Sequence, residues 1–257
     1  MPQTADANAA TRVEKDSMGT MEVPSDVLYG ASTQRAVLNF PISGRPVPAE
    51  IIRAYALLKA AAAHTNRALG KLDDAKAKAI DQACAMIREG MTDRGGIERH
   101  FPIDIFQTGS GTSTNMNVNE VVSNLICIAN GAPIGSSKDQ AYLETPAGVH
   151  PNDHVNMGQS SNDTFPTAMH IAAAVAIKEI LLPAVSRMAA MLDEKAKAWD
   201  EVVKIGRTHL QDATPIRLGQ EFSGYASQMH HAEERLHRAL HTLGELAIGG
   251  TAVGTGI

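Results

Sequence analysis

Aromatic residues are scarce in this sequence and make up only 4% of its 257 residues. Strands favour aromatic and β-branched side chains, whereas alanine, of which there are 39, is the best helix former. The composition therefore argues against a β sandwich and predicts helices packed through small side chains. The length allows one large domain or two smaller ones, so a core can form without disulfides or a structural metal.

An excess of positive charge and a set of paired cysteines are also missing. The chain carries 23 Lys and Arg against 28 Asp and Glu, a formal net charge of −5, which gives no electrostatic footprint for a phosphate backbone. Nucleic acid is therefore not expected as a partner. Cys84 and Cys127 lie far apart inside helical-looking runs, so we expect two small buried apolar side chains and a reducing, cytoplasmic environment.

Long hydrophobic runs are absent too. The longest uncharged apolar stretch, residues 164–177, ends at Lys178 and falls short of the roughly 20 residues that span a bilayer. The first 16 residues contain Asp6 and Glu14 and no apolar centre, so they match neither a signal nor a transit peptide and predict a frayed arm. We therefore expect a soluble protein with no membrane partner.

Turn-forming residues divide the rest of the chain into segments. Residues 17–47 are rich in proline and glycine and predict an extended arm with at most short strands. Apolar spacing and glycine stops predict helices over 48–69, 73–90 and 113–130, and a polar stretch over 131–164 separates them from two longer helices. We predict a mainly α fold, with an N-terminal helical domain over 1–158 and part of a long central helical bundle over 159–257.

The two long helices have different patterns. Residues 165–199 carry two apolar rows, which predict burial on more than one side, and Pro183 should interrupt the helix. Residues 218–246 carry apolar side chains at alternating spacings of four and three, which is a heptad pattern. Such a helix is about 43 Å long and needs helical partners, from this chain or from other copies of it.

Three short polar clusters stand at the starts of predicted helices, at residues 109–115, 159–164 and 206–212. Each holds several Ser, Thr, Asn or Gln side chains, more than the single residue that a helix cap needs. Helix N-termini with neighbouring hydroxyls and amides suit an anion, so three clusters together could hold a ligand with two carboxylates. Simple capping stays open for any one cluster. The first cluster meets neither nucleotide-binding fingerprint.

Histidines supply candidates for proton transfer and for metal binding. His150 and His154 are four residues apart, but Pro151 between them argues against a continuous helical face, so we expect no metal there. His230, His237 and His241 flank the heptad pattern and are expected in solvent or at an interface. His209 lies within the third cluster, next to possible anion ligands, where general acid–base chemistry is plausible.

Four stretches together resemble the signature motifs of class II fumarases, in the aspartase/fumarase superfamily. They are GSGTSTNMNVNE at 109–120, VHPNDHVN at 149–156, QSSNDTFPTAMH at 159–170 and GRTHLQDATP at 206–215, and they occur in family order. Residues 23–35 and 249–256 also resemble the family. The resemblance implies reversible hydration of fumarate to L-malate, a step of the tricarboxylic acid cycle, without metal or cofactor, in a mainly helical homotetramer whose active sites combine residues of three subunits.

The resemblance also assigns roles by matching motif positions. His209 would help to activate water. The substrate carboxylates would be bound by Ser110, Gly111, Thr112, Asn115, Ser160, Ser161, Asn162 and Thr208. A second dicarboxylate site near the entrance would involve His150, Pro151, Asn152 and Asp153.

Two departures from the family pattern limit what we expect of this chain. Ala147 stands where members often have an arginine, three residues before the second-site histidine, which puts that site in doubt. Members are also longer and carry a Gly-Ser-Ser-x-Met-Pro-x-Lys-x-Asn loop with the catalytic serine, which this sequence does not contain, so we expect no hydratase activity from these residues alone. An aspartase-like ammonia-lyase and a non-catalytic helical assembly fragment are the alternative readings; His209 favours the hydratase, because aspartases usually have glutamine there.

Overall fold

The computed structural model describes residues 10–256 and divides the chain into two compact units. One unit contains the chain up to Ala172 together with Leu246 onwards, and the other contains Ala173–Glu245. The boundary between the two units therefore lies within a helix, whereas the expected domain boundary lies at residues 158/159, in the polar stretch before that helix. Compact units are not the same as domains, so the domain boundary stays a prediction. The structure is mainly helical, as expected.

The first unit begins with a β hairpin and a helix. Strands β1 (Thr11–Asp16) and β2 (Gly19–Pro24) pair antiparallel, with Thr11 opposite Pro24, and α1 (Ala31–Asn39) follows. The predicted frayed arm is thus wrong for residues 11–16, and the predicted extended arm is wrong for 31–39. Pairing with the adjacent strand orders β1, whereas α1 is ordered by a distant residue, Glu120, which leaves no local pattern in the sequence.

The carboxylate of Glu120 caps the start of α1 from another helix. It accepts hydrogen bonds from the backbone N–H groups of Gly30, Ser32 and Thr33 at 2.9, 3.0 and 3.1 Å, and from the Thr33 hydroxyl at 2.7 Å. These are donors that a helix start otherwise leaves unpaired, and a negative charge suits the helix dipole. A short segment that looks irregular in sequence therefore forms a helix.

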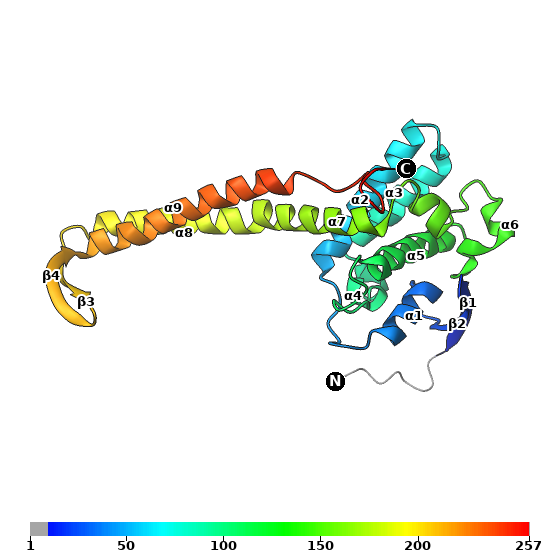
Figure 1. Ribbon diagram of the computed structural model, residues 1–257, viewed down its shortest axis with the longest axis horizontal. Coiled ribbons are helices and arrows are strands. Elements are labelled where there is room, and N and C mark those ends of the chain that lie inside the picture. The colour runs from blue at the N-terminus through cyan, green and yellow to red at the C-terminus, as the bar shows by residue number, and fades with distance from the viewer. Residues whose placement is uncertain (1–9, 257) are drawn as a thin grey trace. The chain divides into compact units, whose positions relative to one another are not determined.

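Three longer helices build the core of this unit (Figure 1). They are α2 (Ala49–Ala68), α3 (Asp74–Arg88) and α5 (Thr112–Ala129), each within two residues of the predicted bounds. Cys84 and Cys127 are free and buried, as expected. Two short elements lie between α3 and α5, namely η1 (Thr92–Arg94) and α4 (Ile97–His100). Three more follow α5: η2 (Ser136–Lys138), α6 (Gln140–Leu143) and the π-helical turn η3 (Pro151–Val155).

The central helix α5 is buried over most of its length, and many of its buried side chains are polar. Asn117 donates to the carbonyl of His100, and Asn124 donates to the carbonyl of Leu28, both at 2.9 Å. Buried amides are tolerated when such partners are present. The helix therefore holds the surrounding loops by specific hydrogen bonds as well as by apolar contact.

One continuous helical segment runs from Ser161 to Ala198 and consists of α7 (Ser161–Ala176), the π-helical turn η4 (Ile177–Leu181) and α8 (Leu182–Ala198). The interruption predicted at Pro183 takes the form of this π turn just before the proline. By length and composition alone the segment could cross a membrane: its most apolar 18-residue window has a mean hydropathy of 1.7, and 17% of that window is buried. Lys178 ends the uncharged stretch without ending the helix, so the expectation of no membrane partner stays a prediction.

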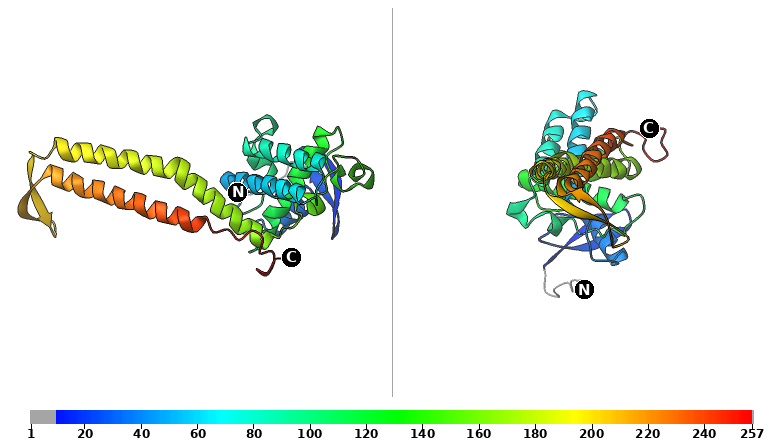
Figure 2. Two further views of the ribbon diagram at one scale, coloured as in Figure 1. Left: turned by 90° about the horizontal axis from the view of Figure 1, so that it is seen from above. Right: turned by 90° about the vertical axis from the view of Figure 1, so that its left-hand side faces the viewer.

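In the second unit, α8 and α9 (Leu218–Leu243) lie side by side and antiparallel, as Figures 1 and 2 show. The heptad helix is thus confirmed. Trp199 and Phe222 pack edge to face at 4.7 Å between ring centroids, and Tyr225 continues the contact at 5.7 Å. Met188 and Met191 stay 53% and 59% exposed, so one partner helix does not cover the apolar surface of the pair.

Candidate dicarboxylate site

The first two predicted clusters meet at the starts of α5 and α7. The Thr112 and Ser161 hydroxyl oxygens are 2.8 Å apart, although the residues are 49 positions apart in sequence. Ser110 lies 2.9 Å from Thr112, oxygen to oxygen, and the Asn162 backbone N–H donates to the Ser160 hydroxyl at 3.3 Å. The structure therefore brings two of the three clusters together into one polar patch.

Gly111 makes this close approach possible. Its φ of +69° is in the left-handed region that favours glycine, and a Cβ built on it would lie 2.2 Å from the Phe165 ring. Any other residue would push α5 and α7 apart. The glycine of the first motif is thus required for the spacing between the two helix starts.

The patch can donate to an anion. Ser110, Thr112 and Ser161 form a row of three hydroxyls with two short mutual contacts, and the Ser161 hydroxyl donates to the Asn162 amide oxygen over a long 3.5 Å contact that an anion could replace. Both helices start here. The Gln107 amide oxygen accepts from the Thr114 backbone N–H in the first turn of α5 at 2.9 Å, and the Ser160 hydroxyl accepts from the Asn162 N–H of α7 at 3.3 Å, so side chains satisfy part of each helix start. Helix starts favour negative charge. A carboxylate is the ligand that this arrangement suits.

Asn115, which belongs to the same motif, is held differently from its neighbours. It is buried, its amide oxygen accepts from the Lys59 ammonium at 2.8 Å, and its amide nitrogen donates to Asn156 at 3.0 Å. Lys59 comes from α2 and was not among the predicted site residues. The only signal for it in the sequence is a lysine inside the apolar, alanine-rich run of the helix over 48–69.

A second group that sequence reasoning missed surrounds Asp163. Its carboxylate is buried and accepts hydrogen bonds from the backbone N–H groups of Gly249 and Thr251, at 3.2 and 2.9 Å. The neighbouring Asn162 amide donates to the carbonyl of Ala252 at 3.1 Å. Residues 249–256 therefore lie against the second cluster and form part of its surroundings.

The third cluster belongs to the second unit. Strands β3 (Val203–Thr208) and β4 (Gln211–Arg217) form a hairpin whose two loop residues are His209 and Leu210. The expectation that this cluster stands at the start of a helix is wrong, because α9 begins only at Leu218, after β4. Both have positive φ, 50° and 64°, as a type I′ turn requires. Thr208, His209 and Leu210 are all exposed. The structure does not join this cluster to the other two, so its role stays a prediction.

The predicted second site forms the π-helical turn η3. The Nδ1 atom of His150 accepts from the backbone N–H groups of Asn152 and Asp153, at 3.3 and 3.2 Å, and burial lowers the pKa of this histidine. Pro151 is buried, whereas Asn152 and Asp153 are exposed. The histidine thus caps its own turn. Among the described residues, no group of three or more His, Cys, Asp or Glu side chains is arranged to hold a metal.

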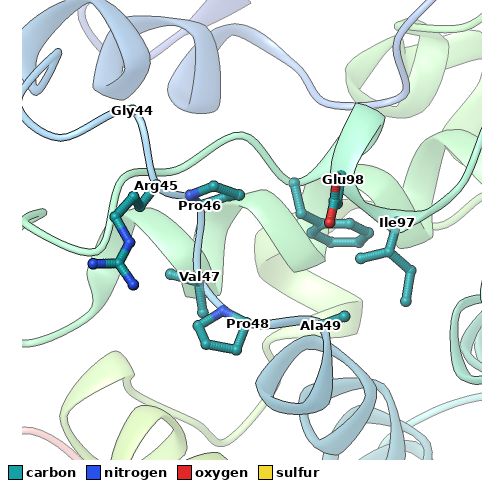
Figure 3. A pocket seen from close by; sticks show the side chains of 9 residues that line it. Gly44, Arg45, Pro46, Val47, Pro48, Ala49, Ile97 and Glu98 are labelled. Atoms are coloured by element: carbon teal, nitrogen blue, oxygen red, sulfur yellow. The ribbon is translucent and has the colours of Figure 1, made fainter. Parts of the chain in front are cut away.

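A pocket of about 290 Å³ lies elsewhere in the first unit (Figure 3). Pro46 and Pro48 line it on one side and Ile97 and Glu98 on the other. None of the predicted site residues lines this pocket. The dicarboxylate patch is thus an open surface and not this cavity.

Two helix starts that meet in a cluster of hydroxyls and amides, in a mainly helical fold, are an arrangement that suits an anion. A sequence model of a lyase family (Lyase_1) matches residues 19–257, and the chain belongs to this family. Similar curated proteins include class II fumarate hydratases. The chain is 54% identical to that of Corynebacterium efficiens and 51% identical to that of Halobacterium salinarum, each over 96% of this chain and 48% and 49% of the relative.

A solved structure agrees with the sequence relatives. The crystal structure of a class II fumarase from Schistosoma mansoni matches with a TM-score of 0.86 and 42% identity, over 96% of this chain and 49% of that one. The chain thus spans about half the length of the relatives it matches. The mainly helical, fumarase-like fold and the resemblance to the N-terminal portion of class II fumarases are confirmed.

Proposed function

We propose that this chain contributes a dicarboxylate site to the reversible hydration of fumarate to L-malate. The observation that carries the proposal is the 2.8 Å approach of Thr112 and Ser161, which unites two polar clusters at two helix starts. Capping explains one polar residue at each helix start but not a shared patch. The similarity to class II fumarate hydratases supports fumarate as the dicarboxylate.

The proposed reaction requires neutral hydrogen-bond donors around a substrate carboxylate. Removing a proton next to a carboxylate builds up a second negative charge on that group, so the site must stabilise a dianionic, aci-carboxylate-like state with oriented donors. Ser110, Thr112, Ser161 and Asn162 offer hydroxyl and amide donors for it. His209 can exchange a proton with the water that adds to the double bond. No metal or cofactor is needed for these steps.

The same family resemblance suggests an assembly, which we also propose. Long helices with exposed apolar side chains suit a homotetramer built around one helical bundle, and sites shared between subunits would let the His209 hairpin of one copy serve the patch of another. We place the protein in the cytoplasm, in the tricarboxylic acid cycle. The proposal includes a second dicarboxylate site at His150, Pro151, Asn152 and Asp153, where Ala147 stands in place of an arginine that family members often have.

A chimera tests the proposed reaction directly. Residues 1–257 would replace the matching half of the Corynebacterium efficiens fumarate hydratase, which is 54% identical over 246 residues. The purified chimera is expected to hydrate fumarate, and Thr112→Val and His209→Gln should each lower kcat/KM at least tenfold, about 1.4 kcal/mol or more of lost transition-state stabilisation.

Two controls sharpen this experiment. Thr20→Val, at an exposed position in β2, should leave the kinetics of the chimera unchanged. Aspartate offered to the same chimera should release no ammonia. Ammonia release would support the aspartase alternative, and a folded chimera without hydration would contradict the proposed function.

A further inference from the structure

Lys59 is a fully buried cation that touches no anion. Its exposed fraction is 0%, and its ammonium donates to the amide oxygens of Asn115, Asn156 and Gln159 at 2.8, 2.9 and 2.9 Å. Within the described residues it forms no ion pair. All three hydrogens of the ammonium are therefore used by neutral amide oxygens, an unusual environment for a lysine.

The surroundings of Lys59 make its protonation state sensitive to pH and to nearby charges. Burial lowers its pKa to about 7, and the nearby Cys84 and Asp163 act in the opposite direction. The ring centroid of Tyr55, one turn earlier in α2, lies 6.0 Å from the ammonium. An uncompensated buried charge is costly, and a bound anion in the neighbouring patch would offset part of that cost.

An ammonium also fixes which way an amide points. Lys59 contacts only oxygen atoms, so each amide must turn its nitrogen away, because a flip would place two donors face to face. The Asn115 nitrogen therefore donates to Asn156 at 3.0 Å, and the Gln159 nitrogen donates to the carbonyl of Val155 at 3.0 Å. Asn156 is the centre of the group, since its oxygen also accepts from Asn119 at 3.3 Å.

These amides belong to the two segments that form the patch. Asn115 lies one turn into α5, after Thr112, and Gln159 directly precedes Ser160 and Ser161 at the start of α7. The lysine comes from a third helix, α2, and its hydrogen bonds to Asn115 and Gln159 link the two segments. Removing its charge would free the amides to rotate and loosen both helix starts.

We propose that Lys59 is a positioning residue for the dicarboxylate patch. Its buried ammonium holds Asn115, Asn156 and Gln159 by their oxygens, and so sets the distance between Thr112 and Ser161. It also supplies the positive charge behind the neutral hydroxyls when a dicarboxylate binds. This role in ligand binding rests on the proposed function, whereas the orientation of the amides does not.

The first test needs no ligand. In the 257-residue chain, the side-chain amide resonances of Asn115, Asn156 and Gln159 are followed by NMR from pH 6 to pH 9, together with the Lys59 nitrogen. All four signals should move with one midpoint near pH 7. Amides that do not move, or that move without the lysine nitrogen, would overturn the proposal.

Variants separate Lys59 from the histidines of η3, which also titrate. In Lys59→Met the shared transition should vanish, whereas a transition driven by His150 or His154 would persist and would overturn the assignment. Lys78→Met, an exposed lysine on α3, is the matched control and should keep the transition. If Lys59→Met does not fold, the pH titration of the unaltered chain still decides the question.

The second test adds fumarate. Its affinity for the unaltered chain should fall at least tenfold between pH 6 and pH 9, and Lys59→Met should bind weakly with no such pH profile. A lysine that served packing alone would weaken binding without changing the profile, which would contradict the proposal. If the unaltered chain binds no fumarate at any pH, the proposed function fails, and the amide titration still decides whether Lys59 orients the amides.

Discussion

Gly111 meets two steric demands at the dicarboxylate patch: a φ of +69° and the Phe165 ring 2.2 Å from the position of a Cβ. We predict that Gly111→Ala destabilises the chain by about 3 kcal/mol or more, because left-handed strain and overpacking each cost about 1–3 kcal/mol. Urea denaturation of the purified variant measures this loss.

Gly131 provides the matched control for that substitution. Its φ of +70° is nearly the same, but nothing lies within 4 Å of its Cβ position. Gly131→Ala should therefore cost only the backbone strain, about 1 kcal/mol. Equal losses in the two variants would show that Phe165 does not restrict Gly111.

His100 is a second residue whose chemistry can be tested. Its Nδ1 accepts from the Leu28 backbone N–H at 3.1 Å, so that nitrogen carries no proton, and Nε2 lies 2.9 Å from the Arg94 carbonyl, to which it can donate. Burial lowers the pKa of His100 below its usual 6.5. The unfolded state therefore binds a proton more readily, so this contribution to stability is present above pH 6.5 and is lost as the pH falls through the lower folded-state pKa.

His100→Leu should destabilise the chain by about 1–3 kcal/mol at pH 7.5, because the Leu28 N–H loses its acceptor in a buried place. The difference from the unaltered chain should shrink as the pH falls below 6.5, where the unaltered chain also loses this contribution. Thermal unfolding over a pH series measures it, with exposed His231→Leu as the control. A pH-independent difference would contradict the assigned protonation state.

At the scale of elements, the β3–β4 hairpin stands out because its loop is made of residues that rarely adopt its conformation. Type I′ turns favour Asn-Gly, yet here His209 and Leu210 carry positive φ values of 50° and 64°. Leu210 is 93% exposed, so packing against the described residues 10–256 does not compensate for the strain. Strain of this kind is found at functional sites, which agrees with the role predicted for His209.

Leu210→Gly should stabilise the hairpin by about 1 kcal/mol relative to Leu210→Ala, because glycine accepts a positive φ without a clashing Cβ. Both variants remove the same side chain, so the comparison isolates the backbone. Hydrogen exchange of the β3 and β4 amides measures the free energy of local opening. Equal protection in the two variants would show that the turn is not strained.

Elements with a regular apolar pattern could be predicted from the sequence, and those held by distant partners could not. The helices α2, α3, α5 and α9 follow from spacing and glycine stops. The helix α1 depends on Glu120, 87 residues after Thr33, whereas β1 pairs with the adjacent strand β2 and was missed because no alternating apolar pattern marks it. The hairpin at His209 was missed because its loop lacks the usual Asn-Gly signal.

The candidate site shows the same division. The clusters at 109–115 and 159–164 could be predicted from their repeated hydroxyl and amide side chains before helices, and the structure brings them together. Lys59 and Asp163 act through buried contacts to residues 56 and 88 positions away, namely Asn115 and Thr251. The only local signal for Lys59 is a charge in an apolar run, whereas Asp163 lies within the predicted cluster at 159–164 but its partners in residues 249–251 could not be predicted.

At the scale of the whole molecule, the exposed apolar surface of the α8–α9 pair predicts that further helices pack against it. Met188, Met191 and Tyr225 are all more than 40% exposed, although they lie on the helix pair with the heptad pattern. Apolar surface of this kind favours association, which is the main force in a helical bundle. We therefore expect the chain to associate with itself.

Met191→Glu should weaken this association at least tenfold, because a carboxylate would become buried without a partner. Sedimentation equilibrium over a concentration series measures the dissociation constant. Leu38→Glu, at a position on α1 that is 61% exposed, is the control and should leave the constant unchanged. A compact monomer for the unaltered chain would contradict the expected association.

The most direct test of the central claim is the binding of fumarate to the 257-residue chain, measured by isothermal titration calorimetry with the unaltered chain and Thr112→Val. Hydrogen bonds to a charged ligand contribute about 1.5–3 kcal/mol, so Thr112→Val should weaken binding by about tenfold or more. The account predicts saturable binding that the substitution weakens in this way. Absence of binding, or equal affinity in both proteins, would contradict it.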